Sequence, residues 1–347
     1  MRKTIIQNCF LVLLIVAGLN LIYRFTFYQK DLEEKYPEAQ LLRESQDTTD
    51  IYYFGESSDF TTHPGDTNKK SISSLVQDFF PSLKITTVDK PATHAGIYRK
   101  WLQQLEMPAP RPKAIIVTLN LRSFDATWRH SKLETQLQEG FVLTRPFPAI
   151  INRFFLSLQF FDNKTAEERE QEMLEEWRTT PLEFPFPFKY STVTEWDQAM
   201  ANGTYLNEDG SWNVPKITLA CHYIKTYAFN IKEDNERLQD FDAIYSWCAK
   251  NNVRLFYNLM AENIEYADSL VGRELVFLMK QNRDILVERY NKGICTVIDN
   301  LERVEGSSFI DQDWTTEHYD FSGRLSIARN ASNTLKKFFQ QHYKKAY

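Results

Sequence analysis

Two adjacent serines, Ser57 and Ser58, follow a run of β-favouring residues at positions 51–54 ("IYYF") and are candidates for a catalytic nucleophile. Gly55 and Glu56 stand between the run and the serines. A glycine lets the chain turn tightly, and the N-terminus of a following helix favours a developing negative charge. The plainer alternative is that the two serines only cap that helix. The pattern therefore predicts a strand followed by a turn, and leaves the role of each serine open.

Three later segments place polar groups after other apolar runs. Gly96 opens a helical pattern after residues 83–88, Asn120 directly follows residues 114–119, and His318 precedes the last helical pattern. A serine hydrolase needs a nucleophile, a base, a group that orients the base, and donors aimed at the oxyanion. The Gly96 N–H and the Asn120 side-chain amide can supply such donors, and His318 can supply the base.

Five short apolar runs, each rich in β-branched or aromatic residues, alternate with helical patterns along the chain. The runs occupy residues 51–54, 83–88, 114–119, 253–259 and 294–298, and the helical patterns occupy 71–80, 96–105, 265–290 and 321–343. This alternation predicts an α/β protein with a doubly wound, mostly parallel five-stranded sheet. Ligands on such sheets bind at the carboxyl ends of the strands, which is where the candidate residues fall.

The interval from about residue 125 to 250 is too long for a simple crossover between two strands. It contains an acidic helical run at 163–178 and helical patterns at 214–227 and 235–251. We expect an inserted, mainly helical subdomain or lid there. The aromatic stretch at 184–190 contains two prolines and cannot form a regular helix. We expect it to pack aromatic side chains on the core as a loop, rather than to line a substrate groove.

The N-terminus has the features of an uncleaved membrane anchor. Arg2 and Lys3 precede an apolar stretch at residues 4–23, which is about the length of one membrane-spanning helix, and no small-x-small cleavage site follows it. Positive charge at the N-terminus favours a cytoplasmic N-terminus and an external domain. We therefore expect an anchor at 1–28, a charged spacer at 29–48 and the folded domain at 49–347.

Composition excludes several other classes. The formal net charge is −5, from 41 Lys and Arg against 46 Asp and Glu, and no basic cluster suits nucleic acid. The cysteines outside the anchor, Cys221, Cys248 and Cys295, have neither the even number of a disulfide framework nor the short spacing of a zinc site. We expect them to be buried and apolar in character. We also expect no metal and no cofactor.

Taken in order, these segments resemble the SGNH, or GDSL-like, hydrolase superfamily. The family's first block, Gly-Asp-Ser, is similar to "GES" with Glu56 in place of the aspartate, which assigns the nucleophile to Ser57. Its glycine and asparagine blocks match Gly96 and Asn120, which with the Ser57 N–H would form the oxyanion hole. Its histidine block matches His318. The resemblance implies a three-layer α/β/α, flavodoxin-like fold from residue 51 to the C-terminus.

The sequence departs from the family in its acid and in its third block. The family's acid lies three residues before the histidine, where Thr315 stands, so we prefer Asp313 as the acid, with Asp311 as the alternative and a Ser-His dyad as a third option. The family's third block often continues Asn-Asp, whereas Leu121 and Arg122 follow Asn120 here, and the Arg122 guanidinium could bind an anionic or carboxyl-bearing substrate. His94, two residues before Gly96, is a further candidate for substrate contact.

The resemblance extends to membrane-anchored bacterial proteins of polysaccharide O-acetylation and of teichoic acid D-alanylation. It implies an ester hydrolase or O-acyltransferase, anchored in the bacterial cytoplasmic membrane, with a periplasmic or extracytoplasmic catalytic domain. The expected substrate is an acyl ester, acetyl above all, of cell-envelope carbohydrate, and other polysaccharide-modification proteins would be partners. The alternative is an inactive carbohydrate-binding or assembly subunit of an envelope complex. We expect no nucleic acid partner.

Overall fold

A five-stranded parallel sheet forms the centre of the protein. The computed structural model describes residues 2–105 and 110–343. The strands are β1 (Ile51–Gly55), β2 (Ile85–Asp89), β3 (Ala114–Leu119), β4 (Arg254–Leu259) and β5 (Cys295–Asp299), in the order β2-β1-β3-β4-β5. Every neighbouring pair is parallel. This is the flavodoxin-like order, and it confirms the predicted fold class.

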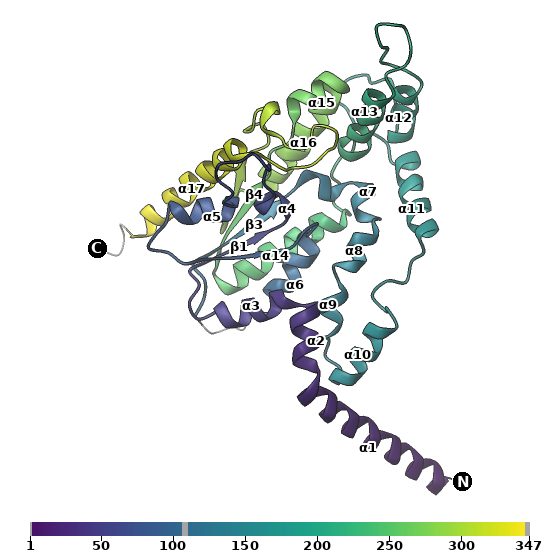
Figure 1. Ribbon diagram of the computed structural model, residues 1–347, viewed down its shortest axis with the longest axis vertical. Coiled ribbons are helices and arrows are strands. Elements are labelled where there is room, and N and C mark those ends of the chain that lie inside the picture. The colour runs from purple at the N-terminus through teal and green to yellow at the C-terminus, as the bar shows by residue number, and fades with distance from the viewer. Residues whose placement is uncertain (1, 106–109, 344–347) are drawn as a thin grey trace.

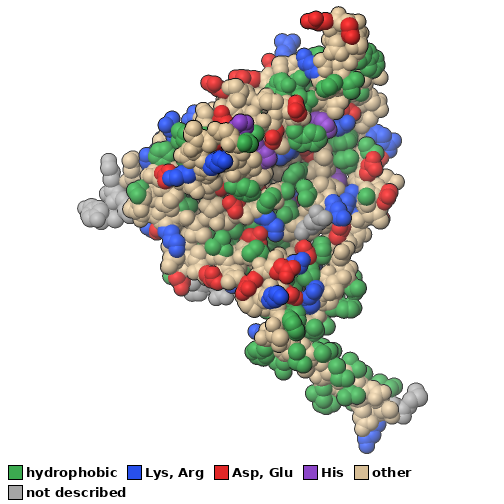
Figure 2. Space-filling model, in the orientation of Figure 1, with side chains coloured by type: hydrophobic (Ala, Val, Ile, Leu, Met, Phe, Trp, Pro, Cys, Tyr) green, Lys and Arg blue, Asp and Glu red, His purple; other side chains and the backbone are tan. Residues whose placement is uncertain are grey.

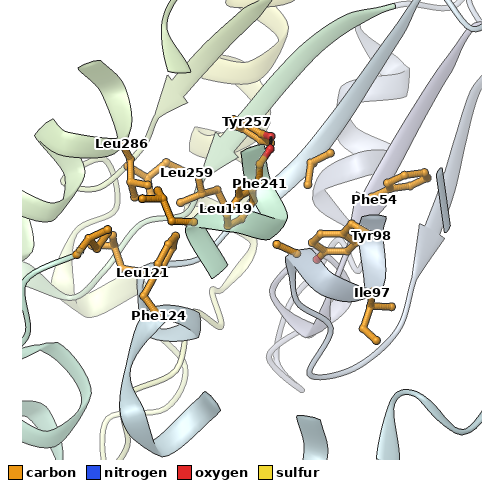
Figure 3. Packing of buried hydrophobic residues seen from close by; sticks show 14 of the residues in the cluster. Phe54, Ile97, Tyr98, Leu119, Leu121, Phe124, Phe241, Tyr257, Leu259 and Leu286 are labelled. Carbon is orange, nitrogen blue, oxygen red and sulfur yellow. Dashed lines mark hydrogen bonds between the residues drawn. The ribbon is translucent and has the colours of Figure 1, made fainter. Parts of the chain in front are cut away.

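Helices cover both faces of this sheet (Figure 1). One face carries α3 (Pro37–Ser45), α6 (Ala95–Leu102), α14 (Glu236–Asn251) and α16 (Arg273–Tyr290), and the other carries α5 (Ile72–Asp78) and α17 (Phe321–Tyr343). Side chains alternate between these two cores along each strand: in β1, Phe54 enters the first and Tyr53 the second. Figure 3 shows the first core, where Tyr98 lies near Phe54 and Phe241 near Tyr257.

The predicted strands are confirmed to within one or two residues, because continuous apolar runs are typical of strands buried on both faces. The predicted helix at 265–290 is interrupted, however. It forms α15 (Ile264–Leu270) and α16, separated at Gly272, whose φ of 120° is open to glycine but strained for other residues. The cysteines outside the first helix, Cys221, Cys248 and Cys295, are buried and unpaired, as expected.

The segment expected to be a spacer is instead folded onto the domain. Residues 28–45 form α2 (Tyr28–Lys35) and α3, and their apolar side chains Leu32, Tyr36 and Leu42 are at most 2% exposed. Gly140 packs so closely on the turn between these helices that a Cβ there would lie 2.4 Å from the Lys35 carbonyl oxygen. The first helix is therefore joined to the domain through packed helices.

Between β3 and β4 the chain forms a mainly helical excursion. Its elements are η1 (Leu121–Phe124), α7 (Ala126–Arg129), α8 (Lys132–Gln136), α9 (Glu139–Val142), α10 (Ala149–Ser157), α11 (Ala166–Thr179), α12 (Val193–Ala201) and α13 (Val214–Tyr227), followed by α14. Only α14 is the crossover helix of the sheet, since it packs beside α6 and β4. The aromatic stretch at 184–190 is not helical, and Phe184, Phe186 and Phe188 pack against Phe277 or Trp196.

The N-terminal helix α1 (Arg2–Thr26) projects away from the domain (Figure 1). Within Lys3–Thr26, an 18-residue window has a mean hydropathy of 2.3 and is not buried by the rest of the protein, whereas Tyr23 near the end of the helix is buried. By length and composition, this helix is apolar enough to cross a membrane.

Candidate active site

Ser57 lies at the carboxyl end of β1, at the start of the short helix α4 (Ser57–Phe60). The preceding residue, Glu56, caps this helix: its side chain is buried and accepts a hydrogen bond from the Ser58 N–H at 3.3 Å. The same carboxylate also accepts from the Ser57 hydroxyl, over 3.1 Å between Oγ and Oε2. Ser57 is partly exposed whereas Ser58 is buried, so Ser57 is the serine that can meet a ligand.

His318 lies within hydrogen-bonding distance of both Ser57 and a carboxylate. Its Nε2 is 3.1 Å from Ser57 Oγ, and its Nδ1 is 2.7 Å from Asp311 Oδ2. The serine hydroxyl has a single proton, so it donates either to Glu56 or to His318. When Nδ1–H of the neutral ring donates to Asp311, Nε2 is the acceptor that competes with Glu56 for that proton. This Ser57–His318–Asp311 chain has the geometry of a nucleophile, a general base and a group that orients the base.

The acid that contacts His318 is Asp311, the alternative, and not the preferred Asp313. The loop after the 3₁₀ helix η2 (Gly306–Ser308) is closed by an antiparallel bridge between Phe309 and Tyr319, and the Ile310 N–H donates to the His318 carbonyl at 2.9 Å. This pairing places Asp311 across from His318 although seven residues separate them. Asp313 lies further along the loop and is exposed.

A second contact fixes Asp311 itself. The hydroxyl of Thr316 donates to Asp311 Oδ2, the same oxygen that His318 contacts. The Asp311 carboxylate is therefore held by Thr316, a residue of the same loop. Only a short turn of the chain separates Asp311 from His318.

Arg122 does not present a free guanidinium to the site, contrary to our expectation that it could bind an anionic substrate. It is buried, its Nη2 lies 2.7 Å from Glu317 Oε2, and its Nη1 donates to the Thr315 carbonyl at 2.6 Å. Both partners belong to the segment that leads into His318. The arginine therefore ties that segment to the end of β3, and its charge is already paired.

Two buried carboxyl groups, Glu262 and Glu317, lie next to this arginine. Their side chains interact with each other, and the Glu262 carboxylate accepts a hydrogen bond from the Tyr227 hydroxyl at 2.6 Å. Burial, the main cause, raises the pKa of Glu317 and raises that of Glu262 well above its ordinary value, and the second carboxylate adds to the effect on Glu262. Of the two carboxyl groups, Glu317 is the one that contacts the Arg122 guanidinium, and the pKa of Glu262 is the one raised well above its ordinary value.

These two glutamates were absent from the sequence analysis. Glu262 follows β4 by three residues, and Glu317 directly precedes His318. Their position near strand ends was the available signal, but a glutamate in such a place is ordinarily exposed. In the folded protein both are buried, Glu317 against Arg122 and Glu262 against the Tyr227 hydroxyl.

Asn120 lies at the end of β3, as predicted, and is 9% exposed. Its Oδ1 is buried and has no hydrogen-bond partner within the described part of the chain. The side chain does not cap the following helix η1. Its amide is thus not committed to local backbone, which suits a donor to a ligand at this edge of the sheet.

Gly96 and His94 belong to a different site. The Gly96 N–H donates to His94 Nδ1 at 3.2 Å, so this amide is not free for an oxyanion. A Cβ at Gly96 would lie 2.7 Å from Asp240 Oδ2, which shows that the glycine faces α14. His94 is buried, and its Nε2 lies 3.0 Å from Glu134 Oε2. Both expectations, an oxyanion donor at Gly96 and a substrate contact at His94, are therefore corrected.

Within residues 2–105 and 110–343, no cluster of three or more His, Cys, Asp or Glu side chains has the arrangement of a metal site. The described site consists of protein groups at the carboxyl ends of β1 and β3 and in the loop after β5. With a hydroxyl, an imidazole and a carboxylate in line, it can carry out nucleophilic substitution at an acyl carbon.

Comparison with known proteins adds little beyond this geometry. No family model matches the chain, and no curated protein matches it. Among solved structures, it is similar to one whose description names a platelet activating factor from Streptococcus pneumonia. The TM-score is 0.40 at 9% sequence identity, over 92% of this chain and 99% of that chain.

Proposed function

We propose that this protein is a serine esterase or O-acyltransferase of the SGNH type that acts through an acyl-enzyme. The observation that carries the proposal is the hydrogen-bonded chain from Ser57 through His318 to Asp311. In that mechanism His318 Nε2 takes the hydroxyl proton while Ser57 Oγ attacks the ester carbonyl. Asp311 holds the imidazole in the required tautomer and stabilises it when it becomes positively charged.

The tetrahedral intermediate carries a negative oxygen that must be stabilised. The Ser57 N–H at the start of α4 and the Asn120 amide are the donors we assign to it. His318 then returns its proton to the departing alcohol. Attack by water on the acyl-enzyme gives hydrolysis, and attack by a sugar hydroxyl gives transfer.

We further propose that α1 anchors the protein in a bacterial cytoplasmic membrane, with the catalytic domain on the periplasmic or extracytoplasmic side. The support is the mean hydropathy of 2.3 over an 18-residue window of α1 and the basic residues Arg2 and Lys3 at its start. An anchored domain of this kind would act on acyl esters, acetyl above all, of envelope carbohydrate. Proteins of polysaccharide modification would be its partners.

Labelling with a fluorophosphonate probe tests the proposal directly. The full chain in detergent should react covalently at Ser57, as located by mass spectrometry of the labelled peptide. The Ser57→Ala variant should not react, and Ser58→Ala is the matched control because its hydroxyl is buried beside the nucleophile. If the native chain stays unlabelled at Ser57, the enzymatic proposal is wrong.

A competition experiment separates hydrolysis from transfer. The enzyme is incubated with 4-nitrophenyl acetate and an excess of an oligosaccharide, and the products are separated by mass spectrometry. Acetylated oligosaccharide indicates a transferase, and acetate alone indicates an esterase.

The alternative from a different class was an inactive carbohydrate-binding or assembly subunit. Its main support was the absence of an acid three residues before the histidine. The contact between Asp311 and His318 removes that support. Covalent labelling of Ser57 by the fluorophosphonate probe would show that this serine is reactive, and would exclude the inactive subunit.

A further inference from the structure

An exposed apolar surface lies on the helical excursion, away from the candidate active site. Phe147, Phe154, Leu158 and Phe160 are each between 53% and 57% exposed, and they belong to α10 and the turns on either side of it. The ring of Phe155 contacts those of Phe147, Phe154 and Phe160, which joins these side chains into one patch. We call this patch, with Leu158 beside it in the chain, the α10 surface. Single exposed apolar residues are ordinary, but contiguous ones mark a contact surface.

The α10 surface is fixed to the end of α1 that is nearest the domain. The Ile150 N–H donates to Asn20 Oδ1 at 3.1 Å, and α10 packs along α1. Arg153 Nε lies 2.9 Å from Asp31 Oδ2, and the Tyr23 hydroxyl donates to the same oxygen at 2.8 Å. These contacts hold α10 and α1 in one arrangement.

The depth of these contacts matches the boundary of a bilayer. Asn20 lies six residues before the end of α1 at Thr26, which corresponds to about 9 Å along the helix axis. Interfacial helices bury their apolar side about 5–10 Å into the boundary between headgroups and acyl chains. If α1 spans the membrane, α10 therefore lies at that boundary.

The charge of the segment also fits lipid. Residues 145–161 contain no acidic residue, and of their two arginines Arg153 is already paired with Asp31, which leaves Arg145 as the basic residue for headgroups. Arg145 is exposed next to Phe147. Basic residues beside apolar side chains are typical of segments that bind anionic headgroups.

We propose that the α10 surface binds the lipid bilayer, as a second membrane contact next to α1. The occupant is lipid because the patch is continuous with the exposed apolar face of α1, as the hydrophobic side chains in Figure 2 indicate along α1 and beyond it. The two contacts together fix the domain at one tilt and distance above the membrane. The inference rests on the proposed insertion of α1.

Depth-dependent fluorescence quenching in vesicles tests this inference. The full chain is labelled at single cysteines with the polarity-sensitive fluorophore NBD and reconstituted into vesicles of phosphatidylethanolamine and phosphatidylglycerol. Cys9→Ser/Phe154→Cys reports on the α10 surface, and Cys9→Ser/Phe160→Cys repeats the measurement at a second position. We expect a blue-shifted emission and a loss of fluorescence with lipids that carry a doxyl quencher near the headgroup.

Two reference positions complete the experiment. Native Cys9 is exposed on α1 and should be quenched by doxyl groups deep in the acyl chains. Cys9→Ser/Leu174→Cys places the label on α11, at an apolar residue that is 47% exposed but outside the α10 surface, and it should not be quenched.

Each outcome decides the inference. Quenching at positions 154 and 160 but not at 174 supports it. Quenching at position 9 alone overturns it while leaving the proposed anchor intact. A blue shift at 154 without lipid quenching indicates a protein partner or a second copy, and also overturns it. If position 9 is not quenched either, both the anchor and the lipid contact are wrong.

Discussion

Two histidines in this protein each contact a carboxylate near the carboxyl end of a strand, but they are built for different purposes. His318 donates from Nδ1 to Asp311, and its Nε2 meets Ser57 at a position where the imidazole is 20% exposed. His94 accepts the Gly96 N–H at Nδ1 and meets Glu134 at Nε2, and its side chain is 1% exposed. In their neutral forms, the two rings carry the proton on opposite nitrogens.

The difference shows what turns a histidine–carboxylate pair into a candidate base. His94 has both nitrogens committed to the fold, and its carboxylate partner Glu134 is also paired with Arg237. His318 has one nitrogen held by an acid and the other facing a hydroxyl that a substrate can reach. A contact between a histidine and a carboxylate is therefore not by itself a sign of catalysis. The group that contacts the other ring nitrogen decides whether the histidine is a candidate base.

The largest predicted effect comes from the nucleophile and the base. Ser57→Ala or His318→Ala should lower kcat for 4-nitrophenyl acetate by on the order of 10⁶-fold, because the two groups act as a unit. His94→Asn should keep a kcat close to that of the native chain. A comparable loss in His94→Asn, with the protein folded, would contradict the distinction between the two histidines.

The next largest effect separates the two aspartates. Asp311→Asn should lower kcat by on the order of 10⁴-fold, because an amide cannot hold the imidazole in the tautomer that accepts the serine proton. Asp313→Asn is the matched control, since this side chain is exposed. Steady-state kinetics measure kcat for both variants. A larger loss of kcat in Asp313→Asn than in Asp311→Asn would show that Asp313 is the acid that orients His318.

A smaller effect compares Asn120 with Gly96, the two predicted oxyanion donors. Asn120→Ala should lower kcat by roughly 100–1000-fold, the usual loss for one such donor, with little change in stability. Gly96→Ala should instead lower the unfolding midpoint, because its Cβ would lie 2.7 Å from Asp240 Oδ2 and 3.0 Å from the His94 ring, and ion pairs hold both side chains in place. Measuring kcat and urea unfolding for both variants checks this, and an unchanged kcat in Asn120→Ala would remove Asn120 from the site.

The smallest effect concerns the pH dependence of stability. Burial, followed by the nearby positive charge of Arg237, lowers the pKa of His94, so the folded state favours the neutral ring. The unfolded chain, with an ordinary histidine pKa near 6.5, binds a proton more readily as the pH falls. The His94 contribution to stability is thus present above about pH 6.5 and is lost as the pH falls toward the lowered value.

His94→Asn tests this sign. Asparagine can still cap α6 at the Gly96 N–H but cannot titrate, and it is too short to keep the Glu134 contact. The variant should lose about 1–3 kcal/mol at pH 7.5, and its stability should fall less than that of the native chain between pH 7 and pH 5. Urea unfolding at several pH values measures both, and parallel pH curves would show that His94 is not the titrating group.

Much of the fold could be predicted because it depends on local patterns. The run at 114–119 is apolar at every position, as a strand buried on both faces must be, and it became β3. The spacer at 29–48 was misread because its charged residues mask the buried positions of Leu32, Tyr36 and Leu42. A helix that packs on a neighbour through a few apolar residues gives a weak pattern in one sequence.

The sequence by itself determined the order of the strands along the chain, the placement of Ser57 and Asn120 just beyond two of them, and that of His318 in the loop between the last strand and the last helix. Parallel strands end at one edge of the sheet, so residues that follow them must gather there. This requirement is independent of the details of packing.

Only the tertiary structure decided which groups those residues meet. Asp311 reaches His318 because the Phe309–Tyr319 bridge folds its loop back, and Arg122 is paired because Glu317 is buried with it. Gly96 donates to His94 because α6 begins there, beside α14. Hydrogen bonds and buried ion pairs join atoms that are far apart in the chain. The partner of each group therefore depends on which loops fold back and which charged groups become buried.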